Sequence, residues 1–435
     1  MFDEFRFEHF KSHRASTLPL APLTLMIGTN ASGKTNALEG IRFLSWLSEG
    51  VRLEDIVSDV RDINVSIRGS LGDLGTHGAA TFKLGCSQSK ESAGPWRHFE
   101  IELAVGERDL QILHESIWSE ESKVPLYVVA EETEAHRYEV QVEYNNFARG
   151  GKKPKIPCSN RRPVFTQLDT PSRFKQEASQ KTIPEVTEQL RVALERILFL
   201  DPNPAQMRGY SAASGEMLND DGKNLSGVLH HLCETEGQKS DVLDFIRHLP
   251  EQDVLDLRFI ETERGDVMVK VVESFGGRED EWDAPMLSDG TLRVLAVAAA
   301  VLSAPEGSLI AIEEIDNGVH PSRAGELLKQ IQSVARARNL RVLLTSHNPA
   351  LLDSLPGDAI PHVVCCYRDP DSGDSQLVRL EELRKYPELV ARGPLGRLMT
   401  QGVIEQFVRD RTTEEEERAR NEAWLESLEA QLSTE

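Results

Sequence analysis

The hydrophobic and polar residues of the first third of the chain follow two patterns. Short apolar runs at residues 5–10 and 23–27 flank a proline-containing turn, and helical spacing follows at residues 36–47. Between residues 51 and 145, apolar and polar residues alternate in several short runs, at residues 80–84, 98–104, 126–130 and 138–144. Alternation at a period of two is typical of half-buried, antiparallel strands. These patterns predict strand, strand and helix, followed by an antiparallel β subdomain.

The rest of the chain changes pattern twice. Residues 146–170 lose the alternation and carry Gly, Pro and basic residues, which is typical of an exposed loop, and residues 183–250 have mostly helical spacing. From residue 286 onward, helices and buried strands alternate, at residues 292–302, 308–312, 324–337 and 341–344. That order predicts an α/β fold in which helical crossovers join the strands of a parallel sheet.

The composition narrows the class of protein. The chain has 435 residues, a net charge of −22, 39% apolar and 28% charged residues, as in soluble globular proteins. Its apolar runs are too short to span a bilayer, and no signal region begins the chain. The five cysteines, at positions 86, 158, 233, 365 and 366, form no CxxC pair, which favours a reducing cytoplasm and disfavours structural zinc. We expect a cytoplasmic protein without membrane contact, and the acidic total disfavours a uniformly DNA-coating surface.

A glycine-rich loop at residues 28–35 reads GTNASGKT and matches the pattern GxxxxGK[ST]. It follows an apolar strand and opens a helix, as the motif requires, and a chance match has odds of about one in a hundred. Gly28 and Gly33 let backbone N–H groups face a phosphate chain. Lys34 reaches the β- and γ-phosphates, and Thr35 offers its hydroxyl to Mg²⁺. The loop predicts binding of ATP and Mg²⁺, with further contacts from Asn30, Ser32 and Asn36.

Three later segments carry polar groups at the ends of elements. Residues 308–321, SLIAIEEIDNGVHP, read as a buried strand that ends in Glu313, which would join the Mg²⁺ shell, and Glu314, which would orient or deprotonate the attacking water. In MLSDGTLR, residues 286–293, Ser288 caps a helix and Gly290 lets its N-terminus approach an anion. His347 ends a second buried strand. Taken singly, each also fits a plain structural role: a solvated strand end, an N-cap or a satisfied imidazole.

The order of these four motifs resembles that of ABC-type P-loop ATPases. The resemblance is to the RecF/SMC/OLD-like branch, in the AAA-family ATP-binding proteins that include ATPase subunits of bacterial anti-phage defence systems, and it extends to residues 197–211, 221–232 and 393–404. It implies an ABC-ATPase-like P-loop fold with an antiparallel β subdomain and a mainly helical insertion. The expected parts are 1–145 and 286–412 for the ATPase head, 146–285 for the inserted lobe and 413–435 for an acidic C-terminal helix.

The resemblance also implies roles for individual residues. Ser288 and Gly290 would contact the γ-phosphate bound to the other protomer, which implies a homodimer, or a higher oligomer built from it, with two ATP molecules between the heads. His347 would be the switch histidine that senses the γ-phosphate, and Asn317 and His320 would lie in a loop that crosses the interface. The sequence departs from the wider class in having Glu313 where an aspartate is usual. The glutamine that normally reaches the metal is not assigned, with Gln88 and Gln111 as guesses only.

Two charged segments suggest partners. Six basic residues could grip DNA or an acidic partner, or form a solvated loop that balances an acidic protein: Arg149, Lys152, Lys153, Lys155, Arg161 and Arg162. The tail opens with a capping box of Thr413 and Glu416 and has an apolar stripe that would dock on its own body or on a partner: Trp424, Leu425, Leu428 and Leu432.

The sequence therefore predicts an ATPase (ATP + H₂O to ADP + phosphate) whose ATP-driven head dimerisation switches a DNA-linked process. The absence of long heptad runs disfavours a chromosome-tethering SMC protein. Asp369 and Asp371 resemble the acidic pair of a TOPRIM nuclease only superficially, so we expect no fused nuclease and an effector in trans, a nuclease or a toxin, as in anti-phage defence. Two alternatives stay open: a scaffold that binds ATP with negligible turnover and holds an effector inactive, and a RecF-like DNA repair ATPase.

Overall fold

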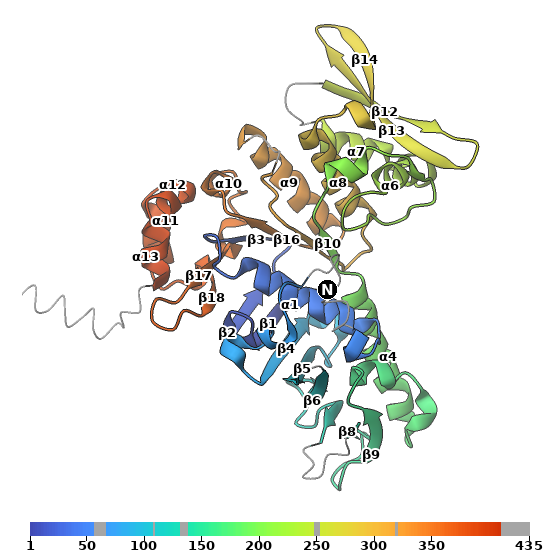
Figure 1. Ribbon diagram of the computed structural model, residues 1–435, viewed down its shortest axis with the longest axis vertical. Helices are drawn as coiled ribbons and strands as arrows, with labels where there is room; N and C mark the ends of the chain where they lie inside the picture. The colour runs from blue at the N-terminus through green and yellow to red at the C-terminus, as the bar shows by residue number, and fades with distance from the viewer. Residues whose placement is uncertain (56–66, 108, 131–137, 248–252, 318–320, 410–435) are drawn as a thin grey trace, which may run out of the picture.

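The computed structural model describes residues 1–55, 67–107, 109–130, 138–247, 253–317 and 321–409. Two large sheets form the body of the molecule, and a third, smaller sheet lies at one end of its long axis (Figure 1). His320 and the predicted C-terminal helix with its capping box fall outside the described residues.

The first sheet is antiparallel and has eight strands in the order β2-β1-β4-β5-β6-β7-β8-β9. Its strands are β1 (Phe2–Phe10), β2 (His13–Pro19), β4 (Thr81–Gln88), β5 (His98–Val105), β6 (Leu110–Trp118), β7 (Tyr127–Val129), β8 (Glu139–Tyr144) and β9 (Lys155–Ser159). The alternating runs are thereby confirmed as strands β4, β5, β7 and β8. The expectation of an exposed loop over residues 146–170 is wrong for residues 155–159, because they pair with β8 as the last strand of the sheet.

The second sheet has six strands in the order β10-β15-β16-β3-β17-β18, all parallel except the last pair. Its strands are β3 (Leu23–Ile27), β10 (Leu198–Leu200), β15 (Leu309–Ile312), β16 (Arg341–Ser346), β17 (Val364–Arg368) and β18 (Ser375–Arg379). Because side chains alternate along each strand, this sheet contributes to two separate cores. Leu25, Ile310 and Leu344 face the helices α8 and α9, whereas Met26, Ala311 and Leu343 face α1 and the antiparallel sheet.

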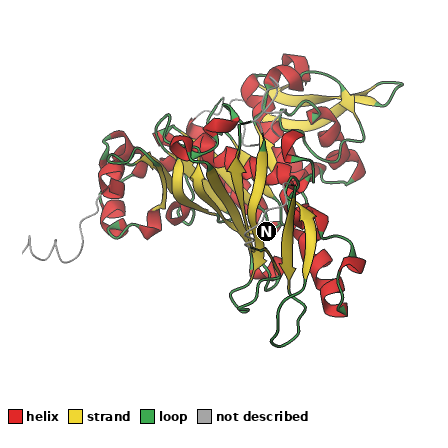
Figure 2. Cartoon of the chain, turned by 60° about the horizontal axis from the view of Figure 1, so that its bottom comes forward, coloured by secondary structure: helices red, strands yellow, loops and turns green. Residues whose placement is uncertain are grey.

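The helices cover the sheets (Figure 2), and several of them lie within residues 146–285, the expected inserted lobe. They are α1 (Lys34–Ser48), α3 (Lys90–Ala93), α4 (Glu177–Glu195), α5 (Pro204–Met207), α6 (Leu225–His230), α7 (Lys239–Ile246), α8 (Asp289–Ser303), α9 (Pro321–Ala337), α10 (Pro349–Asp353), α11 (Tyr386–Ala391), α12 (Leu395–Thr400) and α13 (Val403–Arg409). Single helical turns connect them: η1 (Leu71–Asp73), η2 (Thr76–Gly78), η3 (Val164–Gln167), η4 (Pro171–Arg173), the π-helical η5 (His231–Thr235), η6 (Ala284–Met286), η7 (Ile360–His362) and η8 (Leu380–Glu382). The helical spacing of residues 183–250 is confirmed by α4, α6 and α7.

The inserted lobe also contains strands that the helical pattern did not predict. A four-stranded antiparallel sheet is made of β11 (Ser211–Ala212), β12 (Asp253–Glu261), β13 (Asp266–Phe275) and β14 (Arg278–Asp283). It lies at the opposite end of the long axis from the β8–β9 hairpin (Figure 1). One face packs on α6 and α7, so these strands cover the helical part of the lobe.

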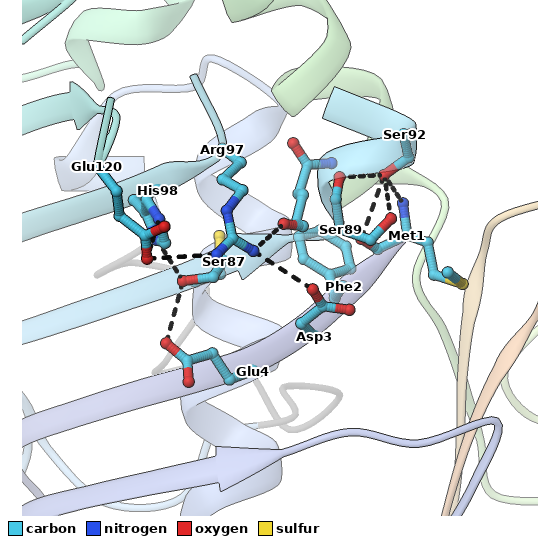
Figure 3. A network of polar contacts seen from close by, with 12 residues as sticks. Met1, Phe2, Asp3, Glu4, Ser87, Ser89, Ser92, Arg97, His98 and Glu120 are labelled. Atoms are coloured by element: carbon cyan, nitrogen blue, oxygen red, sulfur yellow. Dashed lines mark hydrogen bonds and ion pairs between the residues drawn. The ribbon is translucent and has the colours of Figure 1, made fainter. Parts of the chain in front are cut away.

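A polar network ties the edge of the antiparallel sheet together where it meets the parallel one. Arg97 at the start of β5 reaches Asp3 at 3.5 Å and Glu120 at 3.3 Å, and Ser87 contacts His98 Nδ1 at 2.8 Å (Figure 3). Arg341, the first residue of β16, reaches Asp3 at 3.1 Å from the other sheet. This network lies at the amino end of β16, away from the carboxyl ends where a ligand of such a sheet would bind.

Candidate functional site

A cleft of about 400 Å³ opens at the carboxyl ends of β3, β15 and β16. The glycine loop, the acidic strand end and the histidine strand end meet there because parallel strands present their carboxyl ends at one edge. The cleft brings together nine of the predicted site residues: Asn30, Ser32, Gly33, Lys34, Thr35, Asn36, Glu313, Glu314 and His347. Gly28 lies directly before them, at the end of β3.

The two motif glycines stand where the chain leaves no room for a side chain. A Cβ at Gly28 would lie 2.2 Å from the carbonyl oxygen of Cys366 in β17. Gly33 has φ 116°, and its Cβ would lie 2.1 Å from Ser375 Oγ in β18. Both positions therefore require glycine for the close approach of the neighbouring strands as well as for the curvature of the loop.

Lys34 is the cation of the cleft. Its ammonium donates to the carbonyl oxygens of Gly28 at 2.6 Å and Thr29 at 3.1 Å. Burial lowers the pKa of Lys34, and the nearby carboxylates of Glu314 and Asp316 act in the opposite sense. The loop thus holds a half-buried ammonium at its mouth, where a phosphate would be a stronger partner than two carbonyl groups.

Two groups beside Lys34 have no described hydrogen-bond partner. The hydroxyl of Thr35 makes no hydrogen bond, and the carboxylate of Glu313 makes no hydrogen bond or ion pair, to any residue that the structure describes. Burial raises the pKa of Glu313, with Asp201 adding to the effect and Arg42 opposing it. A hydroxyl and a carboxylate at this place are oxygen donors of the kind that Mg²⁺ takes beside a nucleotide, so the residues fit the ion.

Glu314 lies in a strained turn directly after β15. Its φ is 49°, which costs a non-glycine residue about 1–3 kcal/mol. The backbone N–H of Glu314 donates to Thr345 Oγ1 at 3.1 Å, and its carboxylate accepts from Asn317 Nδ2 at 2.5 Å. Thr345 stands two residues before His347 on β16, so the same strand end fixes the turn of Glu314 and carries the histidine.

Comparison with known proteins places the chain in a family. The chain matches a family described as AAA domain, putative AbiEii toxin, Type IV TA system, over residues 119–353, more than half of its length. The chain belongs to this AAA-domain family. The matched region contains Ser288, Glu313, Glu314 and His347 but begins after the glycine loop, so the phosphate-binding motif is an independent observation. Together with the mainly parallel sheet, they give the chain the fold of a P-loop ATPase of the AAA-domain family.

Solved structures with a similar fold are SMC heads. One, an SMC head bound to the C-winged helix domain of ScpA, is 13% identical, with a TM-score of 0.49 and coverage of 89% of this chain and 99% of that one. The SMC head of Thermotoga maritima is 11% identical, with a TM-score of 0.40 and coverage of 87% and 98%. The head of Pyrococcus furiosus, bound to the C-terminal domain of ScpA, is 11% identical, with a TM-score of 0.47 and coverage of 90% and 99%. No curated protein matches the sequence.

Two arginines also line the cleft of this AAA-domain protein, although no sequence motif indicated them. Arg68 lines the cleft with an 80% exposed side chain, while its backbone N–H donates to Glu39 of α1. Arg368 ends β17 and donates to the carbonyl oxygen of Ala31 at 2.9 Å, which holds the glycine loop from the side. Arg368 could have been found from its place at the end of a buried parallel strand, whereas nothing near Arg68 in the sequence points to the site.

A buried polar network supports the glycine loop from below. Ser375 Oγ donates to the carbonyl oxygen of Ser32 at 2.6 Å and contacts Ser12 Oγ, which also accepts from Asn36 Nδ2 at 2.6 Å. His13 Nε2 lies 3.0 Å from the carbonyl oxygen of Gly33; because a carbonyl only accepts, this nitrogen donates. Burial lowers the pKa of His13 to about 4, so the imidazole is neutral near pH 7. The side chain of Asn36 therefore supports the loop in this structure.

The remaining predicted residues lie elsewhere. Ser288 is the N-cap of α8, where its Oγ accepts from the backbone of Thr291 at 3.1 Å, and neither Ser288 nor Gly290 lines the cleft. Gln88 is buried at the end of β4, and Gln111 donates to Asp109 at 3.0 Å, so neither guess for the metal-reaching glutamine lies at the cleft. No described helix is both long and apolar enough for a membrane span.

The six basic residues do not form one loop, because β9 divides them. Lys155 pairs with Glu143 at 3.5 Å, and Arg161, beyond the strand, pairs with Asp109 at 3.7 Å and with Glu54. Lys153 donates to the side chain of Asn146 and to a backbone carbonyl. Three members of the set are exposed and have no ion pair to a described residue: Arg149, Lys152 and Arg162.

The Asp369-Pro-Asp371 segment forms part of the β17–β18 turn. The Asp369 carboxylate accepts from the backbone N–H groups of Asp371 at 2.9 Å and Ser372 at 3.1 Å. That carboxylate holds the turn that returns the chain to Ser375 and the glycine loop. These hydrogen bonds give Asp369 a structural role in the turn.

Proposed function

We propose that the chain is an Mg²⁺-dependent ATPase whose heads dimerise around ATP. The observation that carries this proposal is the single cleft in which Lys34, the adjacent carboxylates of Glu313 and Glu314, and His347 lie together. Thr35 and Glu313 are the groups that would hold Mg²⁺, because their oxygens have no described partner. The ion supplies charge neutralisation at the β- and γ-phosphates.

The side chains of the cleft then take separate roles. Lys34 would exchange its two carbonyl partners for phosphate oxygens, which gain more from a buried cation. Glu314 would orient the attacking water with the carboxylate oxygen that Asn317 leaves open, since Asn317 donates to one oxygen only. His347, exposed at the end of β16, would sense the γ-phosphate, and Arg368 would keep the glycine loop in place.

The position of Ser288 supports a head-to-tail homodimer. Ser288 and Gly290 lie outside the cleft of their own protomer, at the exposed N-terminus of α8, where free N–H groups favour an anion. Met286, two residues before Ser288, is 67% exposed, which suits a surface that a partner covers. In the proposed dimer, each Ser288 turn would contact the γ-phosphate held by the other glycine loop, so that two ATP molecules lie between the heads.

The biological role that we propose is that of an ATPase or sensor subunit in bacterial anti-phage defence, with a separate nuclease or toxin as effector and DNA-linked activation. The support is the family description, which names a putative AbiEii toxin and a type IV toxin–antitoxin system. Two exposed basic residues, Arg149 and Lys152, could meet DNA or an acidic partner. Copurification with the product of a neighbouring gene would test the effector.

The ATPase proposal is tested with two variants and a matched control. Lys34→Ala should lower ATP affinity by roughly 100-fold or more, because it removes the cation of the phosphate site. Glu314→Gln should bind ATP, elute as a dimer and release phosphate about 100-fold more slowly than wild type. Lys329→Ala, an exposed lysine of α9, should behave as wild type. Wild-type turnover by Glu314→Gln would refute the role of that residue.

Wild-type phosphate release separates the two readings of the dimer. A turnover near zero in the wild type, with a stable ATP-bound dimer, would favour the scaffold over the ATPase. ATP-dependent affinity for gapped DNA over intact duplex would favour the RecF-like alternative.

A further inference from the structure

Arg208 connects the inserted lobe to the turn that carries Ser288. Its Nη2 donates to the carbonyl oxygen of Leu287 at 3.1 Å and to the carboxylate of Asp289 at 2.7 Å. These two acceptors belong to the residues on either side of Ser288. One guanidinium group therefore fixes the backbone before Ser288 and the first residue of α8 after it, without touching Ser288 itself.

The contact acts on geometry more than on folding. The side chain of Arg208 is 30% exposed and that of Asp289 is 66% exposed. An ion pair with so much exposure to water adds little to the stability of a fold. The turn itself is exposed and short, and among the described residues the Ser288 side chain has hydrogen bonds to Thr291 alone. Without Arg208, the turn would keep its helix cap but lose the link that sets where the α8 N-terminus points.

On its N-terminal side, the segment that carries Arg208 leads back to the end of β15, where Glu313 lies. Arg208 follows α5, and α5 follows β10, whose Leu200 pairs with Ile312 of β15 and accepts from the backbone N–H of Glu313 at 3.2 Å. Between Leu200 and Arg208, the side chain of Asn203 caps α5 by accepting from the backbone N–H of Ala205 at 3.1 Å. Residues 200–208 are thus a short, hydrogen-bonded connection from the strand end at Glu313 to the turn at Ser288.

We propose that Arg208 is a positioning residue for the contact that Ser288 makes in trans, and that residues 200–208 join the nucleotide site of one protomer to the site that it completes on its partner. The inference rests on the proposed ATP-sandwiched dimer. Arg208 touches no nucleotide in this arrangement. It holds the Ser288 turn so that the hydroxyl and the N-terminal N–H groups of α8 meet the γ-phosphate of the partner together.

The first test uses Arg208→Ala and Arg208→Lys, each alone and combined with Glu314→Gln. Binding of a fluorescent ATP analogue to the monomer should stay within about two-fold of wild type, because the cleft is unchanged. ATP-driven dimerisation of the double variant and turnover of Arg208→Ala should each fall by about ten-fold or more. Arg208→Lys should recover part of both, because the ammonium keeps the charge and N–H donors of the side chain but not the reach and fixed geometry of the guanidinium.

Arg247→Ala is the matched control, since it removes another exposed arginine of the same lobe that pairs with an aspartate, Asp244, at 2.8 Å. It should leave dimerisation and turnover at wild-type levels. If Glu314→Gln itself stays monomeric with ATP, the head dimer fails, and this inference fails with it. If Glu314→Gln dimerises and the Arg208→Ala double variant dimerises equally well, only the role of Arg208 is overturned.

Mixed dimers distinguish a trans role from a general defect. With Arg208→Ala in one protomer and Lys34→Ala in the other, one composite site keeps both an intact glycine loop and an intact Ser288 turn. With both changes in the same protomer, each site has lost one of the two. We expect about half of the wild-type activity in the first arrangement and almost none in the second. Equal activity in the two arrangements, at any level, would overturn the proposal.

Discussion

Burial raises the pKa of both Glu115 and Glu313, yet the surroundings of these two glutamates differ completely. Glu115 of β6 is fully buried, and its carboxylate accepts from the hydroxyl of Tyr127 and from the backbone N–H groups of Val164 and Phe165, each at 2.7 Å. Glu313, at the end of β15, is partly buried and has no described partner. Burial raises the pKa of Glu115 to about 7 despite its three donors.

We propose that this difference separates a structural carboxylate, Glu115, from a functional one, Glu313. At Glu115 every donor belongs to the protein, so the group joins β6, β7 and the turn η3 into one core. At Glu313 the protein provides the cost of burial without the compensating donors, which leaves the compensation to an added cation. In this proposal, the carboxylate in the antiparallel sheet is satisfied on folding, whereas the carboxylate in the cleft is satisfied only when an ion binds.

The largest expected effect comes from Glu313→Gln, which removes the charge and keeps the shape. Mg²⁺-dependent phosphate release should fall by about 100-fold, because the amide is a poor ligand for the ion. The free energy of unfolding in urea should stay within about 1 kcal/mol of wild type or rise, since an unpartnered buried charge is lost. A large loss of stability with normal turnover would place Glu313 with Glu115 as a structural group.

Glu115→Ala should give the opposite result. It leaves two backbone N–H groups and one hydroxyl without an acceptor in the core, which costs roughly 3–5 kcal/mol of unfolding free energy. ATP affinity of the folded protein should not change, because Glu115 lies in the other sheet. Urea denaturation and an ATP titration below the transition measure the two quantities. Glu102→Ala, a half-buried glutamate of the neighbouring strand β5, is the control and should cost far less.

The dependence of stability on pH should also differ in sign between Glu115 and His13, the histidine that supports the glycine loop. The folded pKa of Glu115, about 7, lies above its ordinary 4.5, so the stability it adds is full below pH 4.5 and is lost as pH rises through 7. The folded pKa of His13, about 4, lies below its ordinary 6.5, so its contribution is full above pH 6.5 and is lost as pH falls through 4. Each shift corresponds to roughly 3 kcal/mol.

Urea denaturation between pH 4.5 and 7 separates these contributions. Relative to wild type, Glu115→Gln should gain stability steadily as pH rises. The variant lacks the loss of stability that ionisation of Glu115 causes, and the opposing titration of His13 remains. His13→Asn should instead lose stability steadily as pH rises relative to wild type. Parallel pH curves for wild type and both variants would mean that neither group titrates as its burial requires.

The same contrast explains what the sequence alone could and could not predict. The glycine loop, Glu313, Glu314 and His347 were predictable because each motif follows a buried strand, and parallel strands bring their carboxyl ends to one edge. Arg208 and Arg68 were not, since their contacts join segments far apart in the chain and no local spacing encodes them. The link from Arg208 to residues on both sides of Ser288 becomes visible only when the lobe is packed on α8.

The strands that the pattern missed lie mostly at sheet edges. β2 and β9 are the two outer strands of the antiparallel sheet, and β14 pairs only with β13. Edge strands tolerate proline and charge because one side of their backbone faces no partner, and β9 contains Pro157 while β14 reads REDEWD. Their polar composition hides the alternation that identified β4, β5 and β8 inside the sheet.

The smallest expected effect tests the same distinction on the basic residues. Lys155 and Arg161 are paired, like Glu115, whereas Arg149 and Lys152 are exposed without a described ion pair, as Glu313 is without a partner. Reversing both free charges, Arg149→Glu with Lys152→Glu, should weaken any stimulation of ATPase activity by DNA by about three- to ten-fold at moderate salt, with basal turnover unchanged.

Arg162→Glu is the matched control for that double variant, because Arg162 is also exposed and has no ion pair to a described residue but lies beyond the far end of β9. Five residues of strand separate the two groups, about 17 Å, so a short DNA contact near Arg149 would not reach it. Equal loss in both variants would indicate a broad electrostatic field, and unchanged stimulation in the double variant would sink the DNA contact. An unpaired charge would then be no guide to function on this surface, in contrast to the role that we propose for Glu313 in the cleft.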